Sequence, residues 1–447
     1  MNIEREMRTA AWYGDHRLRL DFPSGWNVTT HWPRTPEPLT DARIIECLQN
    51  PTGQPRISEL CKGKRRPLIL VDDVNRPTPA ARIMPFLLNE FADAGIPRSN
   101  ITVVIARGSH GAPEPNSIAL KVGQEATTTC RVLLHDPYRE TSRIGATSFG
   151  TPVHVNRHVL KSDFVMGIGG VYPNNTAGFG GGAKLALGVL DIRVISQLHR
   201  KHPGAGWGAP DGENSFRKDL NEIAQMVGLQ TMVTAHVNAN RELVRVRSGD
   251  YPSYYNEEVA FAREAFRAPK PIGADVVISN AFPNDLSLTF VHMKGINPLR
   301  HAPQQASRIV LGACSEGEGF HGVYPIVRMP LFHERRDRLR RISLMTPSEI
   351  AKKIFEKLGS KVLPKQSESS DASASGRTGP MPALKKPKNP IWMYRTGSSK
   401  NSLPPAVRGM RVVHNWNEIL GRVREEQGGR DNLNVVVYPC APLQIIE

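Results

Sequence analysis

Short, almost entirely apolar runs alternate along the first half of the chain with segments of helical character. The runs lie at 67–71, 101–106, 132–135 and 164–168. Continuous apolar runs of this length are typical of strands buried on both faces, as in parallel sheets. A short strand is also expected at 16–22, and helices are expected near 40–50 and 80–94. The alternation predicts an α/β fold with a mostly parallel sheet.

A second series of apolar runs predicts a second α/β domain. These runs lie at 275–279, 308–312 and 434–439. The Pro- and Lys-containing segment 268–273 separates the two series, so we predict an N-terminal domain at 1–268 and a C-terminal domain at 274–447. Residues 365–390 are rich in Ser, Lys, Pro and Gly, which predicts a flexible insertion within the second domain.

Bulk properties agree with a two-domain globular protein. A chain of 447 residues exceeds what one core usually supports. No run approaches the roughly 20 apolar residues of a membrane span, and the charged N-terminus does not resemble a signal peptide. The five cysteines are scattered and form no CxxC pair, which indicates neither a zinc site nor a disulfide framework. We therefore expect a cytoplasmic protein without a membrane partner.

The formal net charge of +16 raises the question of nucleic-acid binding. Much of the basic excess lies in two short runs, at 335–341 and 385–388. Neither run has interleaved aromatic residues that would stack on bases. The charge therefore indicates a surface that favours small anionic molecules, and nucleic acid is disfavoured as a partner.

The segment 169–184 contains six glycines and ends at Lys184. It follows a predicted buried strand and precedes the apolar segment 185–190, where a helix is expected to begin. Strand, glycine loop and helix start form an arrangement in which backbone N–H groups hold an anion, with Lys184 placed to pair with it or react with it. The loop lacks the Ser or Thr of a Walker motif and fits the GxGxxG spacing poorly. The alternative is a flexible surface loop with an incidental lysine.

Polar residues also follow two earlier predicted strands. Asp72, Asp73 and Arg76 come after the strand at 67–71, and His110 comes after the strand at 101–106. Arginine can hold a carboxylate through two parallel hydrogen bonds, and histidine can act as a general base near neutral pH. Because functional loops gather at the carboxyl ends of parallel strands, we expect these groups to meet. The alternatives are an Asx turn with a local salt bridge and a bystander histidine.

A predicted helix at 195–202 carries His199 and His202, three residues apart, so that both could face one side. Either neutral imidazole could ligate a metal. The pair matches no strong metal motif such as HExxH.

Together these segments resemble the nickel-pincer lactate racemase family. The resemblance covers most of residues 40–330 and depends on the segments 72–79, 106–110 and 177–184 and on His199. It implies two α/β domains with the active site in the cleft between them. It also implies an isomerase, a racemase or epimerase of a 2-hydroxy acid that works by reversible hydride transfer from the substrate Cα to a pyridinium ring.

The same resemblance implies nickel and a nickel-pincer nucleotide, pyridinium-3-thioamide-5-thiocarboxylic acid mononucleotide. Lys184 would carry this cofactor covalently, and His199, or second to it His202, would ligate the nickel. Cofactor-maturation enzymes would be partners. The residues expected to contact the cofactor besides Lys184 are Asp73, Gly180, Gly181 and Gly182.

For the substrate, the resemblance implies His110 as a catalytic base and Arg76 as the anchor of the carboxylate. Lys294 is a weaker match to a second-domain lysine that holds substrate, since the residues around it depart from the family pattern.

One departure concerns the second catalytic base. Where the family usually has a histidine after the proline of the glycine loop, this chain has Asn174, and an amide is not a base near neutral pH. Asn174 could instead shape substrate choice by hydrogen bonding. The alternative functions are a one-sided 2-hydroxyacid oxidoreductase and a non-catalytic protein that binds the cofactor or an anionic metabolite. Other groups that could supply the second base are Tyr172, His154, His158 and His292.

Overall fold

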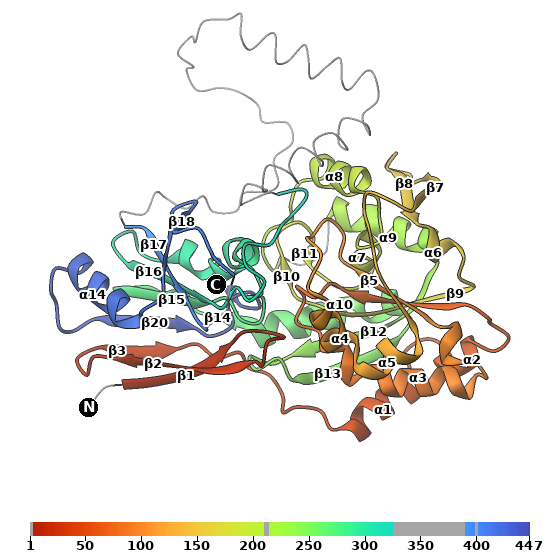
Figure 1. Ribbon diagram of the computed structural model, residues 1–447, viewed down its shortest axis with the longest axis horizontal. Coiled ribbons are helices and arrows are strands. Elements are labelled where there is room, and N and C mark those ends of the chain that lie inside the picture. Colours follow the sequence, from red (N-terminus) through yellow and green to blue (C-terminus); the bar gives the residue numbers. More distant parts are fainter. Residues whose placement is uncertain (1–2, 210–213, 325–388, 398–400) are drawn as a thin grey trace, which may run out of the picture.

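The computed structural model describes residues 3–209, 214–324, 389–397 and 401–447 and contains two large, mostly parallel sheets (Figure 1). This confirms the predicted α/β class with two α/β units. Both basic runs and most of the predicted insertion at 365–390 lie outside the described residues. In the described part of the chain, no helix has the length and apolar character needed to cross a membrane.

The first sheet has six strands, of which only β13 is antiparallel to its neighbour. In spatial order they are β13 (Leu243–Gly249), β12 (Leu229–Val237), β9 (Phe164–Gly170), β4 (Pro67–Asp72), β5 (Thr102–Ala106) and β6 (Arg131–Leu134). The central strands β4 and β9 are buried at every position because both faces of the sheet are covered. Ile69 and Val71 of β4 enter one hydrophobic core, and Leu68 and Leu70 enter the other.

Helices and small hairpins surround this sheet. The helices are α1 (Asp41–Gln49), α2 (Ile57–Leu60), α3 (Met84–Asp93), α4 (Pro115–Val122), α5 (Gln124–Thr129), α6 (Arg157–Leu160), α7 (Lys184–Leu187), α8 (Ile192–Lys201), α9 (Ser215–Val227) and α10 (Tyr251–Phe266), with 3₁₀ turns η1 (Ala80–Arg82) and η2 (Arg98–Asn100). The paired small strands are β7 (Thr141–Ala146) with β8 (Pro152–Asn156), and β10 (Pro173–Asn174) with β11 (Gly178–Phe179).

The helix expected at 80–94 is divided into η1 and α3. Pro85 stands at the start of α3, where its missing N–H leaves no bond unmade. The helix expected at 195–202 begins earlier, because the Asp191 carboxylate caps the amide of Arg193.

The second sheet has seven strands, of which only β18 is antiparallel to its neighbour. In spatial order they are β18 (Ala406–Val407), β19 (Met410–Val413), β17 (Ile391–Arg395), β16 (Ser307–Gly312), β15 (Val276–Asn280), β20 (Asn434–Tyr438) and β3 (Asn27–Thr30). Its helical elements are α11 (Leu288–Phe290), the π-helical turn η3 (Val291–Gly295), the 3₁₀ turn η4 (Pro298–His301) and α14 (Trp416–Glu426), and β14 (Arg267–Ala268) pairs with β21 (Ile445–Ile446).

The N-terminal strands correct the predicted division at residue 268, because they lie against the second sheet (Figure 1). β3 pairs in parallel with β20, and the hairpin of β1 (Ile3–Thr9) and β2 (His16–Phe22) lies beside it. Phe22 and Trp26 belong to the same core as Val276. The rest of the division, at 268–274, stays a prediction.

The loop after β4 depends on a buried ion pair. The Asp72 carboxylate lies 2.6 Å from the Lys121 ammonium and 2.6 Å from the Thr78 hydroxyl, and it also accepts the Gly170 amide. Lys121 also donates to the carbonyl oxygens of Arg76 and Thr78. The chain from Asp72 to Thr78 is therefore fixed at both ends by one lysine.

We expect Lys121→Met to lower the free energy of unfolding by about 3–5 kcal/mol, because it leaves the Asp72 carboxylate buried without its cation. Chemical denaturation of the cofactor-free protein measures this change. Lys62→Met, at an exposed lysine, is the matched control and should change stability by less than about 0.5 kcal/mol. Equal effects of the two substitutions would contradict the structural role of the pair.

Candidate active site

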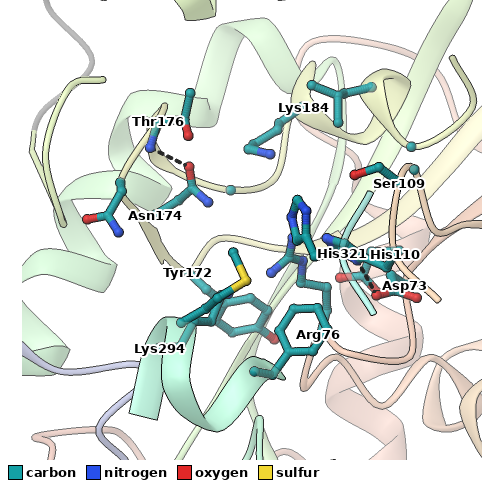
Figure 2. A pocket seen from close by; sticks show the side chains of 18 of the residues that line it. Asp73, Arg76, Ser109, His110, Tyr172, Asn174, Thr176, Lys184, Lys294 and His321 are labelled. Atoms are coloured by element: carbon teal, nitrogen blue, oxygen red, sulfur yellow. Dashed lines mark hydrogen bonds and ion pairs between the residues drawn. The ribbon is translucent and has the colours of Figure 1, made fainter. Parts of the chain in front are cut away.

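A cavity of about 320 Å³ is lined by residues of both sheets' loops and helices. Asp73, Arg76, His110 and Lys184 come from the first half of the chain, and Lys294 comes from η3 of the second. Figure 2 shows these side chains around one space. The structure therefore brings together groups that are more than 200 residues apart in the sequence.

His110 is held by Asp73. Its Nδ1 lies 2.7 Å from the Asp73 Oδ2, and since a carboxylate only accepts, Nδ1 carries the proton and Nε2 keeps its lone pair. Burial lowers the pKa of His110, which the Asp73 carboxylate only partly offsets. Burial alone would raise the pKa of Asp73, but His110, Arg76 and Asn75 bring it below its ordinary value. The pair is a neutral imidazole base beside a carboxylate.

This pairing gives Asp73 a positioning role toward His110. Its Oδ2 also accepts the Asn75 amide, whereas its Oδ1 is buried and has no hydrogen-bond partner in the described residues. The expected contact of Asp73 with a cofactor stays a prediction.

Three basic side chains face the cavity without an acidic partner. Among the residues described, Arg76, Lys184 and Lys294 form no ion pair, although all three line the cavity. Burial, Arg76 and Lys184 together lower the pKa of Lys294 well below its ordinary value. A buried cation is unfavourable without a counter-charge, so the cavity is suited to an anionic ligand.

Lys184 has the properties of an amine nucleophile. Burial, with the neighbouring charges of Arg76 and Arg217, lowers its pKa to about 7. A lysine with this pKa is largely neutral at physiological pH, and only the neutral amine attacks carbonyl or acyl groups.

The glycine loop differs from the sequence expectation. The amides of Lys184 and Leu185 donate to the carbonyls of Gly181 and Gly182, so they are not free to hold an anion. α7 has only four residues. Gly182 does not line the cavity, and a Cβ there would lie 2.8 Å from the Tyr255 ring, so this glycine serves packing and not ligand contact. Gly180 and Gly181 do line the cavity.

His199 and His202 lie in different environments. His199 lines the cavity, and its Nδ1 donates to the Ile195 carbonyl at 2.7 Å, which leaves the Nε2 lone pair free. Burial lowers its pKa to about 4, so the ring is neutral. His202 is outside the cavity and bonds to Ser215 and Asp219 at 3.0 and 2.8 Å, which removes the second choice for a metal ligand.

Asn174 is engaged in its own loop. Its Oδ1 accepts the amides of Thr176 and Ala177 at 2.9 and 3.0 Å (Figure 2). Only its Nδ2 donor remains for a ligand in the cavity that it lines. Asn174 therefore neither replaces a histidine base nor accepts a hydrogen bond from a substrate hydroxyl.

Two of the four alternatives for the second base line the cavity, and two do not. His154 and His158 do not line the cavity, whereas Tyr172 and His292 do. The Tyr172 hydroxyl lies 3.2 Å from the Thr78 hydroxyl, and burial raises its pKa far above neutrality. Burial, Arg300 and Arg408 lower the pKa of His292 to about 4, so its ring is a neutral base.

Two cavity residues, His321 and Arg300, were missed by the sequence analysis. His321 lies in the loop after β16, a strand that we predicted. The rule that functional loops follow the carboxyl ends of parallel strands was applied only to the first domain, and it would have drawn attention to this histidine. Arg300 lies in the 3₁₀ turn η4, and no motif marks it.

The donor set bears on the expected nickel cofactor. Within the described ranges, no group of three or more His, Cys, Asp or Glu side chains could hold a metal ion. The cavity offers the free Nε2 of His199 as a metal ligand and the amine of Lys184 as a nucleophile. These groups fit a cofactor that brings most of its own metal donors and attaches to the protein.

Comparisons with known proteins identify lactate racemases as relatives of this chain. Residues 13–208 match the family described as the lactate racemase N-terminal domain. The chain is 25% identical to a lactate racemase of Thermoanaerobacterium thermosaccharolyticum over 73% of its own length and 74% of that protein. It is 24% identical to a lactate racemase of Lactiplantibacillus plantarum over 64% of its own length and 69% of that protein.

Solved structures share the fold. The lactate racemase apoprotein of Thermoanaerobacterium thermosaccharolyticum superposes with a TM-score of 0.67 at 19% identity, over 99% of this chain and 100% of that chain. A crystal structure of a Thermotoga maritima protein gives a TM-score of 0.56 at 14% identity, over 92% and 100%. The family model and the curated relatives therefore show that this chain resembles lactate racemases, and the solved structures show a shared fold.

Proposed function

We propose that this protein is a nickel-pincer-nucleotide-dependent racemase or epimerase of a 2-hydroxy acid. One observation carries the proposal. The Asp73-held base His110 shares a single cavity with the nucleophilic Lys184, the free imidazole of His199 and the unpaired Arg76. This combination offers a proton acceptor, a point of covalent attachment, a metal ligand and a carboxylate anchor.

Lys184 would hold the cofactor covalently, and the Nε2 of His199 would ligate its nickel. Gly180 and Gly181, which line the cavity between them, would contact it through their main chain. When bound, the cofactor supplies a pyridinium ring that accepts and returns a hydride. The protein provides the remaining requirements, which are orientation, charge and proton transfer.

Arg76 and Lys294 would bind the substrate carboxylate. Neither forms an ion pair within the described residues, and a guanidinium can hold a carboxylate through two parallel bonds. His110 would accept the hydroxyl proton at Nε2, and the Asp73 carboxylate would stabilise the resulting imidazolium. Phe290 packs edge-on against His110, with 4.9 Å between ring centroids, and limits the access of water.

The second face of the substrate needs a second base, and His292 is the remaining cavity group that is neutral and unpaired in the described chain. A one-sided 2-hydroxyacid oxidoreductase is the second candidate. The observation that favours it is that Asn174 uses its only acceptor oxygen within the loop.

Protein co-produced with the cofactor-maturation enzymes should show, after denaturation, a mass increase that Lys184→Ala abolishes. The physical reason is that the pKa of Lys184 is lowered to about 7, which makes its amine nucleophilic near neutral pH. Intact-mass spectrometry measures the adduct, and metal analysis of the native sample should find nickel. An adduct that persists in Lys184→Ala would refute the tether.

The reactivity of Lys184 in the cofactor-free protein should rise with pH around about 7, where the amine loses its proton. From pH 6 to pH 8 the neutral fraction grows from about one tenth to about nine tenths, so acylation should accelerate about tenfold. Peptide mass spectrometry after brief acetic anhydride labelling measures the acylation of Lys184. Nα-acetyllysine, which has a free ε-amine, is the control in the same tube. Arg76→Gln should move the midpoint upward, because it removes a neighbouring positive charge. If the labelling of Lys184 depended on pH in the same way as that of Nα-acetyllysine, the lowered pKa of Lys184 would be contradicted.

His110→Ala should abolish turnover of 2-hydroxy acids while leaving the cofactor adduct in place, because His110 is the base and not the tether. Asp73→Asn should lower kcat about 10²-fold or more, because it changes the tautomer of His110. Chiral chromatography with a keto-acid assay follows both products. The opposite epimer supports the racemase, free keto acid supports the oxidoreductase, and full activity of His110→Ala would refute both.

A further inference from the structure

His321 is brought beside His110 by a short backbone ladder between the two halves of the chain. The Gly111 amide donates to the Phe320 carbonyl at 2.9 Å, and the Gly322 amide donates to the Ser109 carbonyl at 2.7 Å. The two imidazole rings lie 4.9 Å apart between centroids. His321 is only 6% exposed, and it lines the cavity near Lys184 and Arg76 (Figure 2).

The tautomer of His321 is fixed by two backbone amides. Val323 N and Tyr324 N both donate to its Nδ1, at 3.2 and 3.1 Å. A ring nitrogen that accepts these bonds must hold a lone pair, so the proton of the neutral ring is on Nε2. Burial and the nearby basic groups lower the pKa of His321 well below its ordinary value, which keeps the ring neutral.

His110 and His321 therefore present opposite functions to the cavity. His110 offers the Nε2 lone pair, because its Nδ1 proton is donated to Asp73. His321 offers an Nε2–H that has no hydrogen-bond partner in the described chain. A hydroxyl group can satisfy both rings at once, since its O–H donates while its oxygen accepts.

We propose that His321 is a catalytic hydrogen-bond donor that forms, with His110, a site for the oxygen of the reacting alcohol. The inference rests on the proposed function. The O–H bond breaks, its proton passes to His110 Nε2 and its electron pair forms the C=O bond. The carbon–hydrogen pair leaves as hydride to the acceptor that the proposed cofactor provides. The His321 proton stays on Nε2 and stabilises the charge that develops on the oxygen.

The same hydrogen bonds show that His321 is not the second catalytic base, a role that Asn174 cannot fill either. Nε2 already carries a proton, and Nδ1 is occupied by two amides, so His321 has no position for a second proton. It acts on the oxygen as a neutral electrophile and not as a second base.

The tautomer can be tested without cofactor or activity. In the apoprotein labelled with ¹⁵N-histidine, NMR at neutral pH should show His321 with a protonated Nε2 and an unprotonated Nδ1. His321→Gln assigns the resonance, and His414→Gln, at an exposed histidine, is the matched control. A proton on Nδ1 would overturn the proposal.

The oxygen site can be tested by binding a carbonyl probe. Pyruvate should bind the apoprotein, and isothermal titration should show about tenfold weaker binding for His321→Ala. His321→Gln, whose amide N–H can reach a similar position, should retain most of the affinity. Unchanged affinity of His321→Ala, or absence of pyruvate binding by the unsubstituted protein, would overturn the inference.

In the cofactor-loaded enzyme, His321→Ala should lower kcat about 10²–10³-fold, with the adduct on Lys184 and the thermal midpoint unchanged. His321→Gln should recover activity to within about tenfold of the unsubstituted enzyme. Equal losses in both variants would mean that His321 acts as an acid or base, and lost adduct or stability would mean a structural role. Either result refutes the donor role. Absence of an adduct on the unsubstituted protein would refute the proposed cofactor instead, and tautomer and pyruvate binding would then decide the role of His321.

Discussion

The Asp72 carboxylate, at the end of central strand β4, accepts the Lys121 ammonium, the Thr78 hydroxyl and the Gly170 amide. These three donors belong to α4, the loop after β4 and the end of β9. The Asp72 carboxylate therefore holds these three segments together. Such a charge is tolerated in the interior only because every partner is present. The next residue, Asp73, is thereby held at an orientation that reaches His110.

The cavity beyond this anchor is built from cations that the fold leaves without partners. Burial lowers the pKa values of Lys184 and Lys294, and the charge of Arg76 lowers both further. Surface lysines with nearby acids would have ordinary pKa values and would be poor nucleophiles at neutral pH. The feature that makes the cavity suited to anions is therefore the same feature that lowers the pKa of Lys184, as the proposed covalent attachment requires.

The sequence predicted the class of the fold because its central strands are continuous, mostly apolar runs. Lys184, His110 and Arg76 could be placed because they follow such runs. It could not predict that β3 would join the second sheet, since four residues without alternation give no register. Nor could the spacing of His199 and His202 show which of them lines the cavity. Their difference arises from tertiary neighbours, the cavity on one side and Asp219 on the other.

Hydrogen-bond direction decides what each ring and amide in the cavity can do. Asn174 Oδ1 and His321 Nδ1 are occupied in the same way, each by backbone amides two and three residues later. Both residues are left as donors, and His110, whose proton is taken by Asp73, is left as an acceptor. The reacting oxygen then has one preferred location, beside His110 and His321. A change of configuration at carbon therefore requires the carbon skeleton to turn about that oxygen, or His292 to serve the other face.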